Sequence, residues 1–321
     1  MKLALIVNPH SGGGRAARSL EAVRAALHGV DHHVELTQSL DHARALARGA
    51  AAAGEVAVAF GGDGLIGAVA GALAIGEHSD GVLGVLPGGR GNDFARALGI
   101  PLEPVQACRT LIDGVERALD LGEVNGNTFI GIASCGFDSD ANRIANETKL
   151  VRGNLVYAYG ALRALLGWRP ATFTLRFDGD RARTFTGYTV AAANSKAYGG
   201  GMLIAPDASL TDGQLDVVLV GDVPKLRFLR LLPTVFKGEH VDQPGVEVVR
   251  AAEITIEADR PFTIFADGDP IAELPATVRV LPAAVRVLAP GGPPRNVPPR
   301  IAARDDRPRP FRRNVPGRPT K

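Results

Sequence analysis

The sequence lacks the residues that several protein classes depend on. Its 321 residues include only two cysteines, Cys108 and Cys135, too few for a disulfide-built scaffold or a multi-cysteine zinc site. His10 lies inside a glycine turn and could meet a phosphate, and the other six histidines show no metal-ligand spacing. No apolar run reaches the ~18 residues of a membrane-spanning helix. The five apolar residues after Lys2 are too few for the core of a signal peptide. We therefore expect a cytoplasmic protein that meets a membrane only at its surface.

A large excess of one charge is also missing, because the formal net charge is only +2. This value combines two unlike parts. Residues 291–321 contain eight Arg, one Lys and two Asp, a net charge of +7, so residues 1–290 carry −5. The main body is a poor match to a basic nucleic-acid-binding fold, and we expect no specific nucleic-acid partner for it. The Pro/Arg-rich end is predicted to be disordered. It could approach an anionic membrane, contact nucleic acid or only keep the chain soluble.

The first 100 residues alternate between short apolar runs and helical patterns. Helices are expected over about 15–27 and 41–53, the second with Asp41 as its N-cap. This alternation is typical of βαβ units on a parallel sheet, so we predict an α/β nucleotide-binding domain over residues 1–122. The expected strands are 3–7, 34–36, 56–60 and 82–86.

Strands dominate from about residue 118 onward. Asn125-Gly126 and Asp178-Gly179 are hairpin-turn signals, and strands 173–177 and 185–193 are expected to pair. We predict a mostly antiparallel β domain over residues 123–277. Strands 278–281 and 285–288 are candidates to return to the first domain and complete it with residues 278–290. Helices are expected over 141–149, 155–166 and 224–236.

Three glycine-rich turns each follow a strand of the first domain, at Asn8–Gly14, Gly61–Gly64 and Pro87–Gly91. The carboxyl ends of parallel strands share one edge of the sheet, so the turns should converge there. Glycine lets backbone N–H groups approach a ligand closely, and the helix N-termini behind the turns favour phosphate. The alternative is that each turn only closes a tight βα connection. None is a Walker P-loop, since no Gly-Lys-Ser/Thr follows at the required offset.

Six motifs, in order along the chain, resemble the diacylglycerol kinase family, which includes bacterial lipid kinases and ceramide and sphingosine kinases and is related to NAD kinases. The resemblance covers residues 2 to about 290. It implies a nucleotide domain and a β-rich lipid-binding domain with the active site in the cleft between them. It also implies transfer of the γ-phosphoryl group of ATP, with Mg²⁺, to a lipid hydroxyl, with diacylglycerol as the first choice of acceptor. The motifs are residues 7–12, 60–64, 87–96, 194–201 with 205–206, 212–213 and 267–269.

The resemblance also implies roles for individual residues. Asp269 stands where the family usually has a Glu general base, and Asp63 and Asp267 complete the catalytic carboxylates. Asp212, with backbone groups of Ser209 and Gln214, would hold a structural metal. Phosphoryl transfer depends on positioning and charge neutralisation, which suits carboxylates at strand ends. The residues expected around ATP are Asn8, Pro9, His10, Ser11, Gly12, Thr37, Gly61, Gly62, Asp63, Gly64, Gly89 and Arg90.

Other interpretations of these residues stay open. Without the family, Asp267-Gly268 is an ordinary hairpin turn, and Asp120 is either part of a metal network or a turn residue. Leu65 and Arg90 replace the threonines that the family usually has at these places. The acceptor could instead be a sphingoid base, phosphatidylglycerol or NAD, or the chain could be a nucleotide-binding regulator without transfer.

The expected partners are ATP and a lipid at a membrane surface, and a homodimer is left open. The segment 225–232, which reads Lys-Leu-Arg-Phe-Leu-Arg-Leu-Leu, is basic and amphipathic. It could rest on anionic headgroups or be a core helix with a solvated edge.

Overall fold

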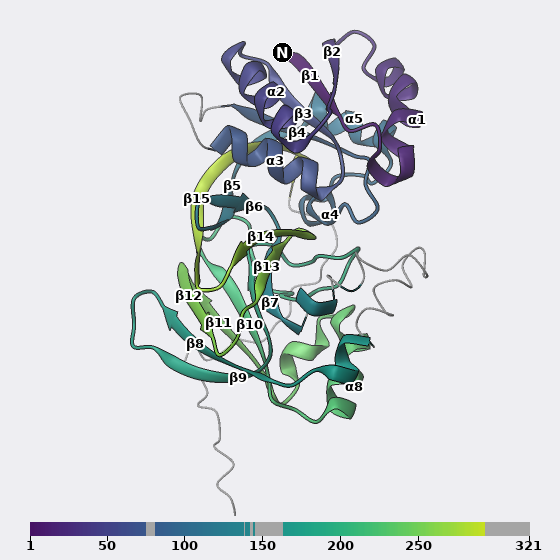
Figure 1. Cartoon of the computed structure of the whole chain (residues 1–321). Coiled ribbons are helices and arrows are strands. Elements are labelled where there is room, and N and C mark those ends of the chain that lie inside the picture. The colour runs from purple at the N-terminus through teal and green to yellow at the C-terminus, as the bar shows by residue number, and fades with distance from the viewer. Residues whose placement is uncertain (75–80, 138, 142–143, 145–162, 293–321) are drawn as a thin grey trace, which may run out of the picture.

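The computed structural model describes residues 1–74, 81–137, 139–141, 144 and 163–292 (Figure 1). The expected helices over 141–149 and 155–166 lie largely outside the described residues. The expected disordered segment lies almost wholly outside them, from residue 293 to the end.

A parallel sheet forms the first part of the fold, as predicted. Its strands run in the order β4-β3-β1-β2, and all three pairings are parallel. β3 is buried along its whole length and β1 from its second residue on, which is typical of a sheet covered on both faces. The four strands are β1 (Lys2–Val7), β2 (Asp31–Leu36), β3 (Val56–Gly61) and β4 (Val82–Pro87).

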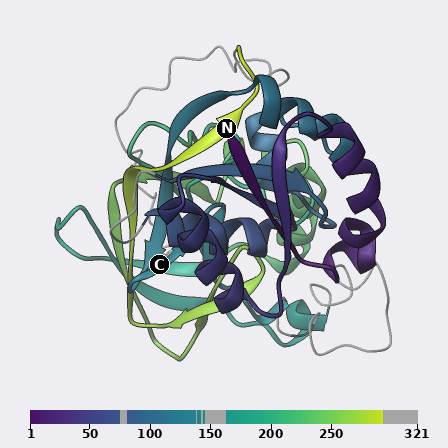
Figure 2. The same cartoon turned by 90° about the horizontal axis from the view of Figure 1, so that it is seen from above.

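Helices cover both faces of this sheet. α1 (Ser11–Ala26) packs with α5 (Pro104–Asp113) on one side, and α2 (Leu40–Ala52) packs with α3 (Asp63–Ala74) on the other, as Figure 2 shows. The short α4 (Asp93–Leu98) follows β4. Ser39 is the N-cap of α2, since its Oγ accepts the His42 N–H at 3.1 Å. The expectation that Asp41 caps this helix was wrong.

The remaining strands make the mostly antiparallel part that the sequence predicted. The Asn125-Gly126 and Asp178-Gly179 turns are both left-handed and close the predicted β5–β6 and β8–β9 hairpins. These strands are β5 (Val115–Val124), β6 (Asn127–Phe129), β7 (Ile132–Gly136), β8 (Ala171–Phe177), β9 (Arg183–Ala193), β10 (Leu215–Gly221), β11 (Val246–Ala251), β12 (Glu253–Ala258), β13 (Thr263–Ala266) and β14 (Asp269–Glu273).

One long strand joins the two parts. The expected strands 278–281 and 285–288 are a single element, β15 (Ala276–Ala289), interrupted near Ala283, whose φ is 50°. Its first half pairs with β12, and its second half lies parallel to β4, with Arg286 opposite Val82. β15 therefore carries the chain back to the first sheet, and the described strands form one 15-stranded sheet.

The second part has its own core of aromatic side chains. Tyr188 on β9 stacks at 4.2 Å on Phe228 of α8 (Lys225–Val235), and Phe137 meets Phe228 edge-on at 4.7 Å. A short 3₁₀ helix, Glu239–Asp242, follows α8. Helix α8 is thus fixed to the sheet through one face, at the end of the molecule away from β1 and β3 (Figure 1).

Candidate active site

The three glycine turns meet at the carboxyl edge of the parallel sheet. The Gly88 N–H donates to the Gly61 carbonyl oxygen at 2.7 Å, and the Asn8 N–H donates to that of Phe60 at 3.1 Å. A Cβ at Gly12 would lie 2.4 Å from the Gly88 carbonyl oxygen, and one at Gly89 would lie 2.5 Å from Gly62 Cα. The turns pack so closely that no larger residue fits at Gly12 or Gly89 without a shift.

Most of the residues expected around ATP lie along this edge. The Thr37 N–H donates to the Val7 carbonyl oxygen at 2.8 Å, which holds Thr37 beside the first turn. Asn8 Oδ1 accepts the His10 N–H at 3.0 Å and so shapes that turn. Arg90 is exposed at the tip of the third turn. The backbone of Gly12, Gly13 and Gly14 is left-handed, so the regular part of α1 begins behind them.

Asp63 is held in one orientation at the start of α3. Its two carboxylate oxygens accept the backbone N–H groups of Asp93 at 3.2 Å and Phe94 at 3.1 Å, at the N-terminus of α4. Asn92 holds the preceding loop, because its side chain both accepts from Gly89 N–H and donates to the Gly89 carbonyl. A carboxylate at a helix N-terminus is electrostatically favourable, so this position is well suited to a fixed negative charge.

Asp93 joins the two parts of the chain and was not among the expected site residues. Its buried carboxylate accepts the Gly200 N–H at 2.7 Å, from the loop between β9 and β10. Burial raises the pKa of Asp93; the Gly200 hydrogen bond opposes this rise, and the nearby Asp63 charge adds to it. The signal was present, since Asp93 lies inside the 87–96 motif, but its partner is more than 100 residues away.

Asp267 anchors the β13–β14 turn against the start of β7. Its carboxylate accepts the N–H groups of Ile130 at 2.8 Å, Gly131 at 2.9 Å and Ile132 at 3.3 Å. Burial raises the pKa of Asp267 to about 7, with the Asp63 charge adding to the rise and the three N–H bonds opposing it. Its φ of 53° is that of a left-handed turn. Asp267 is therefore both a hairpin-turn residue and a residue of the candidate site.

Asp269 faces the start of α3. Its Oδ2 lies 3.2 Å from the position that a Cβ on Gly64 would take, and Asp267 Oδ2 lies 3.6 Å from that of Gly67. Burial raises the pKa of the Asp269 carboxyl. Within the described chain, no hydrogen bond is found to its carboxylate. The first turns of α3 therefore bring Asp63, Asp267 and Asp269 together from opposite parts of the sequence.

This arrangement suits a magnesium ion that is shared with a ligand. Among the described residues, no three Asp, Glu, His or Cys side chains form a complete metal cage. Mg²⁺ is usually held by one or two carboxylates together with the phosphates of a substrate. Among the described residues, none donates a hydrogen bond to the buried Asp93 Oδ1, although Arg96 Nε lies 3.9 Å away. Asp63 and Asp93 are therefore the side chains that fit a Mg²⁺ ion bound with nucleotide phosphates.

Two residues that the sequence left ambiguous are structural. Leu65 is 3% exposed and packs beneath the Gly61 turn, so its apolar side chain belongs to the core. Asp120 is buried, and its two carboxylate oxygens accept the N–H groups of Gly213 at 2.8 Å and Ala283 at 2.7 Å. Asp120 thereby ties the loop before β10 to the interruption in β15.

Among the residues expected to hold a structural metal, Asp212 is paired with an arginine. Asp212 Oδ1 accepts the Gln214 N–H at 3.2 Å, while its other oxygen pairs with the Arg250 guanidinium. Ser209 Oγ lies 3.3 Å from Thr211 Oγ1. Since Arg250 already neutralises Asp212, these positions do not fit a cation in this arrangement. Their role as metal ligands stays a prediction.

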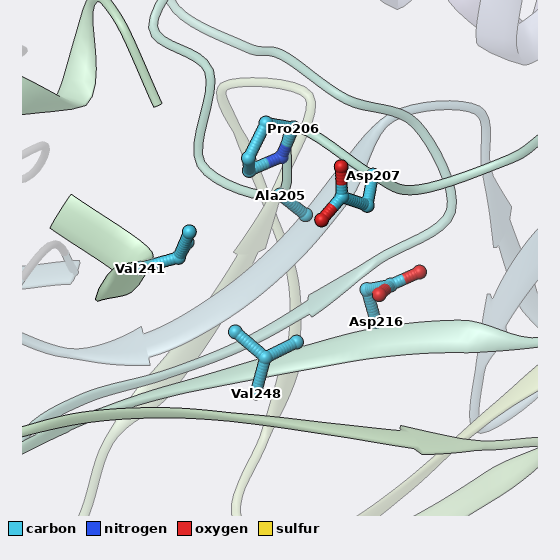
Figure 3. Close-up of a pocket in the computed structure, with 6 residues that line it drawn as sticks. All are labelled: Ala205, Pro206, Asp207, Asp216, Val241 and Val248. Atoms are coloured by element: carbon cyan, nitrogen blue, oxygen red, sulfur yellow. The ribbon is translucent and has the colours of Figure 1, made fainter. Parts of the chain in front are cut away.

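Next to this loop lies a small hollow. Asp216 on β10 and Asp207 both line it (Figure 3). Its walls lie too close together to admit even a water molecule, whereas ordinary ligand pockets have volumes of ~300–1,000 Å³. Arg250 Nε lies 4.0 Å from Asp216 Oδ2, so the arginine that pairs with Asp212 also lies near Asp216. The hollow is too small for a nucleotide or a lipid.

Comparisons with known proteins identify the two parts of the chain. The diacylglycerol kinase catalytic domain matches residues 2–124, and the YegS C-terminal NAD kinase beta sandwich-like domain matches residues 131–289. A diacylglycerol kinase of Mycobacterium tuberculosis is 36% identical over 299 residues, which cover 90% of this chain and 95% of that protein.

A more distant relative and a solved structure agree with this match. A protein of Pseudomonas aeruginosa named "Probable lipid kinase YegS-like" is 32% identical over 301 residues, covering 91% of this chain and 96% of its own. A crystal structure of a diacylglycerol kinase from Bacillus anthracis has a TM-score of 0.70 at 21% identity, covering 90% of this chain and 97% of the other. That structure supports the fold.

Proposed function

This chain belongs to the diacylglycerol kinase-like family of lipid kinases, and we propose that it transfers the γ-phosphoryl group of ATP to a lipid hydroxyl. The observation that carries the proposal is the approach of Asp269, from the second part of the chain, to Gly64 at the start of α3. It brings an acceptor-side carboxylate to the edge where three glycine turns offer backbone N–H groups.

ATP would bind along the glycine edge. Backbone N–H groups of the first and second turns and the N-terminal end of α3 favour the phosphates. Gly62 and Gly89 pack directly against each other, since a Cβ at Gly89 would touch Gly62. Because neither has a side chain, nothing at these two positions covers the backbone of the turns. The exposed Arg90 adds a guanidinium that can pair with a phosphate oxygen, in place of the family's threonine.

Asp63 and Asp93 would hold Mg²⁺ together with the phosphates. When bound, the ion neutralises charge on the phosphate oxygens during transfer. Asp63 is suited to this role because two backbone N–H groups of α4 fix its carboxylate. Asp93 is suited because its Oδ1 is buried without a hydrogen bond from the described residues.

Asp269 would act as the general base. The lipid oxygen attacks the γ-phosphorus, its proton passes to the Asp269 carboxylate, and the bond to the β–γ bridging oxygen breaks to leave ADP. Partial desolvation raises the pKa of the Asp269 carboxyl, which makes its carboxylate a better proton acceptor than an ordinary aspartate. Asp267 would be a positioning residue, because its three backbone hydrogen bonds fix the turn that carries Asp269.

Diacylglycerol, giving phosphatidic acid, is our first choice of acceptor, because a relative covering nearly the whole chain is named a diacylglycerol kinase. The YegS-like name of another relative keeps other lipid acceptors as the second candidate. The remaining alternative is a nucleotide-binding regulator that transfers no phosphoryl group.

Labelled ATP tests these candidates in a single experiment. The full chain is incubated with Mg²⁺ and detergent-dispersed diacylglycerol, sphingoid base, ceramide, phosphatidylglycerol or, as the soluble acceptor, NAD. The proposal predicts label in a lipid, with diacylglycerol labelled fastest. If only NAD is labelled, the acceptor is a dinucleotide and the lipid-kinase proposal is wrong. ATP binding without label in any acceptor would support the regulator.

A further inference from the structure

Helix α8 presents an outward face that combines apolar and basic side chains. Phe228, Leu231 and Val235 point into the aromatic core and are buried. The opposite face carries Leu226, which is 61% exposed, Leu229 at 36% and, just past the helix end, Phe236 at 59%. These positions recur every three or four residues, or multiples of that spacing, so they form one stripe along the helix.

The apolar stripe continues beyond the helix. The carbonyl oxygen of Leu166, whose side chain is 78% exposed, accepts a hydrogen bond from Lys225 Nζ at 3.0 Å, which places Leu166 beside the start of α8. Four of the large apolar residues exposed in the described chain therefore gather at this one place. The others are Met1, Leu36, Leu40, Ile112 and Val115, all in the first part of the fold.

The helix that carries the stripe has only positive side-chain charges, and the exposed Asp222 and Glu239 lie just beyond its two ends. Between Val223 and Gly238 the sequence has four basic residues and no Asp or Glu. None of the ion pairs found within the described chain involves these four. Exposed apolar side chains flanked by Lys and Arg are typical of surfaces that lie in the headgroup region of an anionic bilayer. The four are Lys225, Arg227, Arg230 and Lys237.

We propose that this α8 face, together with Leu166, docks the protein on the surface of an anionic phospholipid bilayer. Two copies of the chain packed through the same face would bring like charges together, which disfavours a second copy as the partner. The inference rests on the proposed function, because a lipid kinase must take its acceptor from a bilayer.

A single strand links the docking face to the site. β7 begins at Ile132, whose N–H donates to Asp267, and ends at Gly136, next to Phe137. Phe137 in turn packs at 4.7 Å against Phe228 on the inner face of α8. Five residues of strand span about 17 Å, so one strand connects the Asp267 turn to the inner face of the helix whose outer face would meet the bilayer.

Vesicle sedimentation without ATP tests the proposal. The full chain, including residues 291–321, is mixed with vesicles of phosphatidylcholine alone or with phosphatidylglycerol added. The variant Arg227→Gln/Arg230→Gln should bind the anionic vesicles on the order of 30-fold more weakly, from ~1 kcal/mol for each cationic residue. Leu226→Ser/Phe236→Ser should lose about tenfold or more on the same vesicles.

Matched controls remove the same groups elsewhere on the surface. Arg109→Gln/Arg181→Gln removes two exposed charges, and Ile112→Ser removes an exposed apolar side chain of the first part. Both should bind like the natural chain. Equal binding of the natural chain and both α8 variants would overturn the proposal. A dimer in light scattering that Leu226→Ser/Phe236→Ser dissociates would also overturn it, in favour of a second copy.

Transfer to detergent-dispersed diacylglycerol separates this proposal from the kinase proposal. The α8 variants should turn over dispersed lipid as fast as the natural chain, because they leave the site intact. If no chain phosphorylates any lipid while the vesicle results hold, the kinase proposal fails and the docking surface stands.

Discussion

Asp93 and Gly200 form a hydrogen bond of 2.7 Å across the two parts of the fold. Asp93 begins α4 behind the third glycine turn, and Gly200 lies in the loop that follows β9. This bond fixes the second part of the chain against the carboxylates of the first.

Two replacements of Asp93 should separate the effect of its hydrogen bond on stability from the effect of its charge. Asp93→Ala leaves the Gly200 N–H without its acceptor and should lower the free energy of unfolding by about 1–3 kcal/mol. Asp93→Asn keeps an acceptor oxygen and should cost less. Urea unfolding measures both, with Asp41→Ala, on the exposed first turn of α2, as the control. Equal losses for Asp93→Ala and Asp41→Ala would contradict the role of this bond.

Asp267 should make the stability of the protein depend on pH. Its pKa is raised to about 7, from an ordinary value of ~3.9. The folded chain therefore binds more protons than the unfolded chain between these values. The extra proton on Asp267 raises the free energy of unfolding. This stabilisation is fully present below pH ~4 and is lost as the pH rises through about 7. Asp267→Asn, which cannot titrate, should flatten this fall in urea unfolding between pH 5 and 8.

A second turn aspartate provides the control for that experiment. Asp178 is also left-handed, and its carboxylate accepts the N–H groups of Ala252 and Glu253 at 2.9 Å each. Asp178→Asn measures what an amide costs in such a turn. A pH dependence that is the same in the natural chain and in Asp267→Asn would show that another group is responsible.

Arg250 should decide whether the Asp212 loop responds to divalent cations. While its guanidinium pairs with Asp212, removal of Mg²⁺ and Ca²⁺ by a chelator should leave the melting temperature of the ligand-free chain unchanged. Arg250→Gln removes the pair and should make that temperature rise with added cation. Arg183→Gln, which breaks the pair with Glu247, is the control. A natural chain that melts several degrees lower in chelator would restore Ser209, Asp212 and Gln214 as metal ligands.

The sequence predicted those parts of the structure that depend on local patterns. The alternation of strands and helices indicated the parallel sheet, and Asn125-Gly126 and Asp178-Gly179 indicated hairpins because few other pairs adopt such turns. The N-cap of α2 was predicted wrongly, because Ser39 and Asp41 are both residue types that cap helices and only the backbone geometry selects Ser39.

Contacts between distant residues could not be predicted in the same way. Asp93 meets Gly200 because the second part folds back on the first, and no local pattern carries that information. The pairing of Arg250 with Asp212 depends on the register of β10 and β11, in which Asp216 lies opposite Arg250. The places of Asp63 and Asp269 were expected from the family resemblance, whereas the backbone hydrogen bonds that fix Asp63 became visible only in the structure.

The most direct test of the account is transfer by Asp269→Asn. The variant keeps the size of the side chain but cannot accept the lipid proton, so the rate of label transfer to detergent-dispersed diacylglycerol should fall by about 10²–10⁴-fold, with ATP affinity unchanged. Asp180→Asn, in the exposed β8–β9 hairpin, should keep the natural rate. Transfer by Asp269→Asn at the natural rate would contradict Asp269 as the base and, with it, the proposed use of this site.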